Sequence, residues 1–93
     1  MNKTEDLQTR VQLISDLMSG LRVAIKQGLI EDFCVEKEGM GDMVHITMSN
    51  DTQDIKTKSR FADHLYDKYK AVVGYISYPM QKESKEFSIF IRL

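Results

Sequence analysis

The sequence predicts one α+β domain over residues 1–93, with the element order helix–strand–strand–helix–strand–strand (αββαββ). Three observations predict this fold class. Apolar residues recur at helical spacing in two segments, they alternate with neighbouring residues in three others, and a further segment, 72–78, is β-branched and aromatic. Turn-forming residues separate these segments. The simplest assembly is a four-stranded antiparallel sheet with both helices packed on one face.

The first helix is expected over residues 4–27, and Gly28 suits its end. Its apolar residues recur in steps of four and three, which is a heptad seam held for nearly three repeats. Such a helix would be about 36 Å long at 1.5 Å per residue, more than a domain of this size needs to cover its own sheet. Either the whole stripe lies on that sheet, or part of it pairs with a second copy, and we expect a homodimer. The predicted self-association seam is Leu7, Val11, Ile14, Met18, Leu21 and Ile25.

The first hairpin is expected over residues 31–49, with a glycine-rich turn at 38–42. It is acidic: residues 30–54 hold seven carboxylates against Lys37 alone, a net charge of −6, whereas residues 55–93 have a net charge of +4. These charges are either ordinary solvated surface, a means of selecting a partner, or a means of head-to-tail contact between copies of the chain. The carboxylates assigned to partner binding are Glu31, Asp32, Glu36, Glu38 and Asp42.

The second helix is expected over residues 52–70, after several N-cap candidates at 49–52. Its first half, residues 56–60, is basic. The second hairpin follows over residues 72–93, and strict alternation makes residues 87–93 the clearest strand of the chain.

Alternation also assigns residues to the two faces of the sheet. The helix-facing side is expected to carry Phe33, Val35, Val44, Ile46, Met48, Val72, Ile76, Phe87, Ile89, Ile91 and Leu93. The open side is expected to carry Cys34, Glu36, His45, Thr47, Tyr75, Ser77, Phe90 and Arg92. Tyr75 and Phe90 beside Arg92 suit an ordinary cross-strand pair, a protein contact, or the stacking of single-stranded nucleic acid.

Motifs for chemistry are weak in this sequence. A metal site from Met40, Met43, His45 and Met48 is disfavoured, because strand alternation turns Met43 and His45 away from Met48. Cys34 and His45 would share a face, but sequence leaves their register open. We therefore predict no enzymatic activity, no metal and no cofactor.

The remaining predictions concern class and location. With Cys34 as the single cysteine, a polar start and no long apolar run, we expect a cytoplasmic protein that does not enter a membrane. We predict a small regulatory protein of the inhibitor or adaptor type that acts by binding another protein, as a homodimer. The alternative is a nucleic-acid-binding protein that uses Tyr75, Phe90 and Arg92 for bases and the basic segment 56–60 for phosphates.

Overall fold

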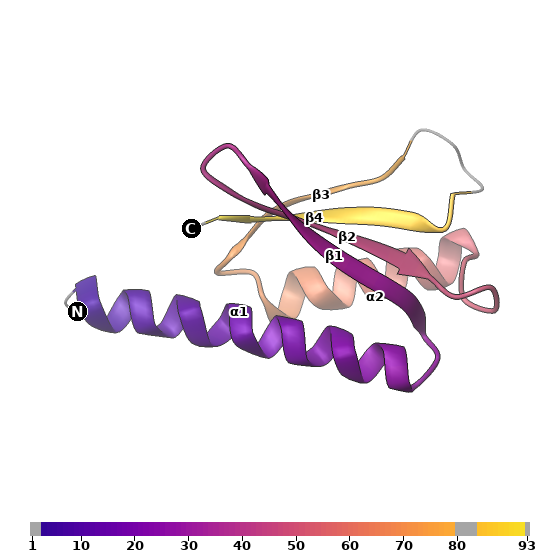
Figure 1. Cartoon of the computed structure of the whole chain (residues 1–93), viewed down its shortest axis with the longest axis horizontal. Helices are drawn as coiled ribbons and strands as arrows, with labels where there is room; N and C mark the ends of the chain where they lie inside the picture. Colours follow the sequence, from indigo (N-terminus) through magenta and orange to yellow (C-terminus); the bar gives the residue numbers. More distant parts are fainter. Residues whose placement is uncertain (1–2, 80–83, 93) are drawn as a thin grey trace.

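The computed structural model describes residues 3–79 and 84–92 and has the predicted αββαββ order (Figure 1). The elements are α1 (Lys3–Lys26), β1 (Ile30–Glu38), β2 (Gly41–Met48), α2 (Ile55–Lys68), β3 (Val73–Ser77) and β4 (Glu86–Arg92). All neighbouring strands are antiparallel, in the order β1-β2-β4-β3, and the helices pack on one side of the sheet. The predicted fold class is confirmed.

The sheet joins two helix-plus-hairpin units side by side. Each hairpin contributes one central strand, β2 or β4, and one edge strand, β1 or β3. The helices α1 and α2 run in opposite directions beneath them (Figure 1). The two units are thus arranged about an approximate two-fold axis through the β2–β4 pair.

The core lies between the two central strands and the helices. Every second residue is buried on β4 and on β2 from Val44 to Met48, and the register sets Val44 opposite Ile89 and Ile46 opposite Phe87. Burial of each such side chain contributes about 1.5–3 kcal/mol. The helices complete this core with Leu17, Leu21, Ala24, Ala62 and Leu65.

The edge strands depart from the predicted helix-facing set. Val35 is 46% exposed, because β1 diverges from α1 towards its hairpin tip (Figure 1). Phe33 and Ile76 are half-buried against the core. Val72 is fully buried, although it precedes β3. Leu93 lies outside the described residues.

The structure divides the predicted self-association seam. Leu21 is completely buried in the chain's own core, so its assignment to a surface seam is corrected. Ile14, Met18 and Ile25 are half-buried beside that core. Leu7 and Val11 are 61% and 58% exposed. The start of α1 projects beyond the ends of the strands (Figure 1), so the first residues of the seam have no sheet to pack against.

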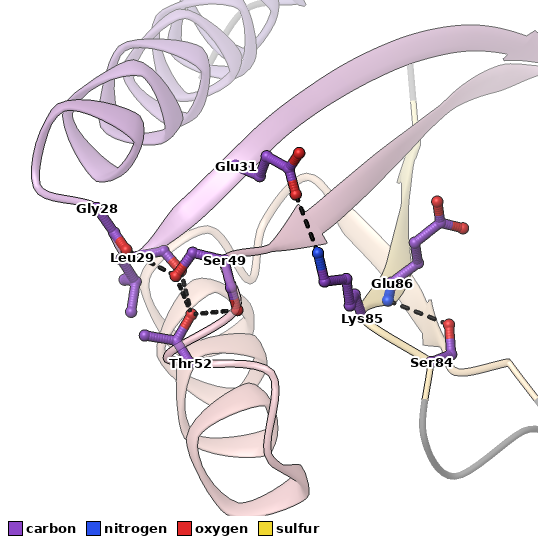
Figure 2. Close-up of polar contacts among 8 residues, drawn as sticks. All are labelled: Gly28, Leu29, Glu31, Ser49, Thr52, Ser84, Lys85 and Glu86. Atoms are coloured by element: carbon purple, nitrogen blue, oxygen red, sulfur yellow. Dashed lines mark hydrogen bonds and ion pairs between the residues drawn. The ribbon is translucent and has the colours of Figure 1, made fainter.

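The connections at one end of the sheet are tied together by hydrogen bonds (Figure 2). Gly28 ends α1 at a φ of 77°. Its N–H donates to the Ile25 carbonyl oxygen, and the Leu29 N–H donates to the Ala24 carbonyl oxygen, which together form a Schellman motif. The Ser49 hydroxyl then donates to the Gly28 carbonyl oxygen at 2.7 Å, and the Thr52 hydroxyl donates to that of Leu29. The α1–β1 turn is therefore fixed to the β2–α2 turn.

The second helix begins later than predicted, at Ile55 rather than residue 52. Asp54 is its N-cap and accepts the Thr57 N–H at 2.9 Å, which holds the pKa of this carboxylate below its ordinary value. The helix ends at Lys68, and the Tyr69 hydroxyl donates to the Asp16 carbonyl oxygen of α1 at 3.3 Å.

Replacing Leu21 tests the division of the seam. We expect Leu21→Ala to lower the free energy of unfolding by about 2–5 kcal/mol, because it leaves a cavity in the core. Val23→Ala is the control, because Val23 is 50% exposed on the same helix and lies outside the seam, and its expected change is within about 0.5 kcal/mol. Urea denaturation measures both, and equal effects would contradict the burial difference between the two side chains.

Candidate functional site

The side of the sheet away from the helices brings two predicted surfaces together. Because Val44, Ile46, Phe87 and Ile89 face the helices, the residues between them face away. We call this side the open face. It carries Asp32, Cys34, Glu36, Glu38, Met43, His45, Thr47, Tyr75, Ser77, Glu86, Ser88, Phe90 and Arg92. The predicted aromatic pair and three of the five predicted partner-binding carboxylates therefore share one surface.

An aromatic stack lies at the β3–β4 part of the open face. Tyr75 and Phe90 are register partners, and their rings stack with centroids 5.1 Å apart and planes 12° apart. Tyr75 is 49% exposed, whereas Phe90 is half-buried. Met43 on β2 is the partner of Phe90 on its other side and is buried. The three side chains form a continuous apolar patch with Tyr75 at its most exposed edge.

Two glycines leave the space that Phe90 occupies. A Cβ at Gly74 would lie 2.8 Å from Phe90 Cδ1 and 3.1 Å from Arg92 Cγ. A Cβ at Gly41 would lie 2.8 Å from Phe90 Cζ and would also meet the Ile91 carbonyl oxygen. The ring thus covers backbone on both strands that flank β4. This close packing holds Phe90, and with it Tyr75, in one position.

A row of polar side chains crosses the middle of the open face. His45 Nδ1 and Ser88 Oγ share a hydrogen bond of 2.8 Å, and His45 Nε2 lies 3.2 Å from Glu36 Oε2. The register also sets Cys34 directly opposite His45, which settles the question that the sequence left open. The imidazole is therefore held between a hydroxyl and a carboxylate.

This polar row resembles a nucleophile–base–acid chain, but it lies on the outward side of three paired strands. Acyl transfer also needs N–H donors aimed at the developing oxyanion. His45 and Ser88 lie on the two central strands, whose N–H groups are directed at neighbouring strands. Cys34 is an exposed free thiol. No group of three or more candidate metal ligands from His, Cys, Asp and Glu occurs among residues 3–79 and 84–92.

The carboxylates of the acidic hairpin divide between the two sides of β1. Asp32, Glu36 and Glu38 lie on the open face, together with Glu86 from β4. Glu31 instead accepts from the Lys85 ammonium at 3.3 Å (Figure 2), and Asp42 lies 3.6 Å from Lys37 Nζ. Among the described open-face residues, Arg92 is thus the one permanent cation against four carboxylates.

The two parts of the predicted nucleic-acid surface lie on opposite sides of the sheet. The segment 56–60 is on α2, which packs on the helix-facing side, whereas Tyr75, Phe90 and Arg92 are on the open face. Lys58 is buried and its ammonium donates to the Ser84 carbonyl oxygen at 2.7 Å. Lys58 therefore anchors the segment before β4 instead of facing solvent.

Sequence reasoning did not assign Met43, Gly41, Gly74 or Ser88 to this surface as functional residues. Alternation had already placed Met43 on the same side as His45, and Ser88 could have been found in the same way, since it lies two residues from Phe90, which is predicted to face outward. The two glycines could not, because their role depends on the register of three strands.

A hollow lies between the helices, on the far side of the molecule from the open face. It has a volume of about 370 Å³ and is lined by apolar side chains that include Val23, Phe61 and Tyr69, with His64 and Lys68 also contributing. The polar side chains at this hollow, His64 and Lys68, do not form a recognisable catalytic or ligand-binding group with the apolar lining.

Comparison with known proteins leaves the site to be interpreted from its own geometry. The chain matches no protein-family model, no curated protein and no solved structure. Within the described residues, neither helix combines the length and apolar character that crossing a membrane requires.

Filling the space at Gly74 tests the packing of the aromatic stack. We expect Gly74→Ala to lower the free energy of unfolding by about 1–3 kcal/mol, because the added methyl group displaces the Phe90 ring. The Tyr75 ring signals should shift in the NMR spectrum as the stack is disturbed. Ser77→Ala, on the same strand and face, is the control, with a change within about 0.5 kcal/mol. Unchanged Tyr75 signals in Gly74→Ala would contradict this packing.

Proposed function

We propose that this protein is a non-enzymatic binding module, a regulator of the inhibitor or adaptor type, whose contact surface is the open face. One observation carries the proposal: the Tyr75–Phe90 stack and the carboxylates of the acidic hairpin share one side of a rigid sheet. The preferred partner is a protein with a basic surface, because carboxylates outnumber the single guanidinium on this face.

The composition of the patch supports protein binding. Tyrosine, phenylalanine, methionine and arginine are enriched in protein interfaces, and tyrosine and arginine also dominate the residues whose truncation costs most affinity. Tyr75 is held by its stack on Phe90, so little side-chain freedom remains to be lost when a partner binds. The carboxylates at Asp32, Glu36 and Glu38 would form the charged rim of this contact.

The same charges weigh against nucleic acid as the ligand of this face. A phosphate backbone is attracted by clusters of lysine and arginine, whereas the described open face has one arginine among four carboxylates. The basic residues of α2 cannot assist from the other side of the sheet. We therefore prefer a protein partner to an oligonucleotide.

We also propose self-association through the exposed start of α1, where Leu7 and Val11 form the surface part of the seam. These two side chains lie one helical turn apart and would bury apolar area against a second copy. We place the protein in the cytoplasm, since the exposed thiol of Cys34 suits a reducing compartment.

Substitution on the open face tests the main proposal. In affinity capture from a lysate of the source organism, we expect Tyr75→Ala and Glu36→Lys each to lose the proteins that the unmodified chain retains. Tyr66→Ala is the control, since Tyr66 is an exposed tyrosine on α2. Circular dichroism would verify that every variant is folded.

The same experiment contains the outcome that would overturn the proposal. Retention of every captured protein by both open-face variants would show that this face is not the contact surface. Binding of the unmodified chain to a single-stranded oligonucleotide, with affinity that falls steeply as salt rises, would favour the nucleic-acid alternative.

Substitution at the start of α1 tests self-association. We expect analytical ultracentrifugation to find a dimer for the unmodified chain and a monomer for the double variant Leu7→Asp and Val11→Asp, because buried carboxylates disfavour the interface. Gln8→Asp, also on the exposed part of α1, should remain dimeric. A monomeric unmodified chain at high micromolar concentration would refute the dimer.

A further inference from the structure

The outer edge of β1 pairs with no other described strand. The Phe33 N–H donates to Asp32 Oδ1 at 2.8 Å, and an incoming strand would replace this hydrogen bond between a side chain and the β1 backbone. β1 spans nine residues, is the longest of the described strands, and lies at the end of the order β1-β2-β4-β3. Alternate residues of an edge strand direct their N–H and C=O groups away from the sheet, where they can pair with another chain. The register is regular from Asp32 to Glu38. The opposite edge, β3, has five residues and a register irregularity between Val73 and Tyr75, which makes it a poorer template.

The two sides of the β1 edge differ in chemistry. On the open face the strand presents Asp32, Cys34, Glu36 and Glu38, all of them exposed. On the helix-facing side it presents Phe33, which packs partly on the core, and the exposed Val35. Lys37 is the single basic residue of β1, and its ammonium lies 3.6 Å from the Asp42 carboxylate. The edge is therefore acidic on the open face, whereas its helix-facing side carries the apolar Phe33 and Val35 followed by the exposed Lys37.

These charges disfavour a second copy of the chain on this edge. In an antiparallel pair of β1 strands centred on Cys34, Asp32 of each copy would stand opposite Glu36 of the other. Like charges directly opposite each other are destabilising. A strand with cations in those positions would instead gain favourable pairs.

We propose that the β1 edge accepts an extended segment of a partner protein as a fifth strand, and that this segment alternates basic and apolar residues. Its basic side chains lie over Asp32, Glu36 and Glu38, and its apolar side chains lie beside Phe33 and Val35. Backbone hydrogen bonds supply the affinity, and the alternating side chains supply the specificity. The inference rests on the proposed function, because it specifies how a basic partner reaches the acidic border of the open face.

A synthetic peptide tests this mode of binding directly. The probe is acetyl-Lys-Val-Lys-Val-Arg-Ile-Lys-amide, titrated into the isotope-labelled protein and followed by NMR. We expect the largest shifts at the amides of β1, and slower hydrogen exchange there. N-methylation of the probe's alternate amides that face β1 should weaken binding by about tenfold or more, because it removes backbone donors and adds steric bulk. The two sets of alternate amides are methylated in separate peptides, since the facing set is not known in advance.

Variants of the protein separate this mode from binding to the open face. Glu36→Lys and Val35→Asp should each lower the affinity for the probe. The first reverses a charge on the open-face side of the edge, and the second places a charge on its helix-facing side. Tyr66→Ala should leave the affinity for the probe unchanged, because Tyr66 is an exposed residue of α2 and lies outside the sheet. Equal affinity for the parent and both methylated peptides, or shifts centred on β3, would overturn the strand addition. If the strand addition fails in this way but Tyr75→Ala still loses the proteins captured from the lysate, the proposed function is supported and only the strand addition is refuted.

Discussion

The pairing of β2 with β4 is the constraint on which the rest of the structure depends. It sets Val44 opposite Ile89 and Ile46 opposite Phe87 beneath the sheet. The same register sets Met43 opposite Phe90 and His45 opposite Ser88 above it. A slip of one residue would exchange these two sets, which would expose the core and bury the polar row. Core stability and the composition of the open face are thus fixed by one pairing.

That pairing also joins the two helix-plus-hairpin units, which are connected a second time at their turns. The Ser49 and Thr52 hydroxyls hold the carbonyl oxygens of Gly28 and Leu29, so the end of α1 and the start of β1 are fixed relative to β2 and α2 (Figure 2). The Lys85 ammonium adds a contact from the start of β4 to Glu31. The acidic hairpin is therefore attached to a rigid base although most of β1 is exposed.

The sequence was sufficient for the element order and for the faces of the central strands, because their alternation is strict from Val44 to Met48 and from Phe87 to Ile91. It was insufficient where a residue's environment depends on distant elements. Alternation places Val35 on the helix-facing side of β1, but Val35 is exposed because β1 diverges from α1 towards its hairpin tip. Leu21 belongs to a regular heptad, but the helix presents it to the sheet. The sequence predicts Lys58 to be a surface cation, but its ammonium donates to the Ser84 carbonyl oxygen, 26 residues away in the chain.

The candidate site was predictable in parts and not as a whole. Alternation identified Tyr75, Phe90 and Arg92 as one cluster and Glu36 as outward-facing, but the sheet order decides whether the two hairpins lie side by side. Since β2 and β4 are neighbours, the acidic strand and the aromatic stack are on one continuous surface. Gly41 and Gly74 gain their meaning only from this order, because Phe90 lies across both of their strands.

Most of β1, the outer strand of the first hairpin, contributes little to the core of the chain. Of the nine residues of β1, Ile30 is buried and Phe33 is half-buried, while the others are exposed. An exposed strand residue adds little apolar burial to offset the conformational entropy lost when its backbone is fixed, which is about 1–2 kcal/mol per residue. The regular strand from Asp32 to Glu38 therefore gains little from the chain's own core. A contact outside the chain would give this segment the burial that it lacks, which is why recognition at the acidic strand explains its length better than chemistry at the polar row.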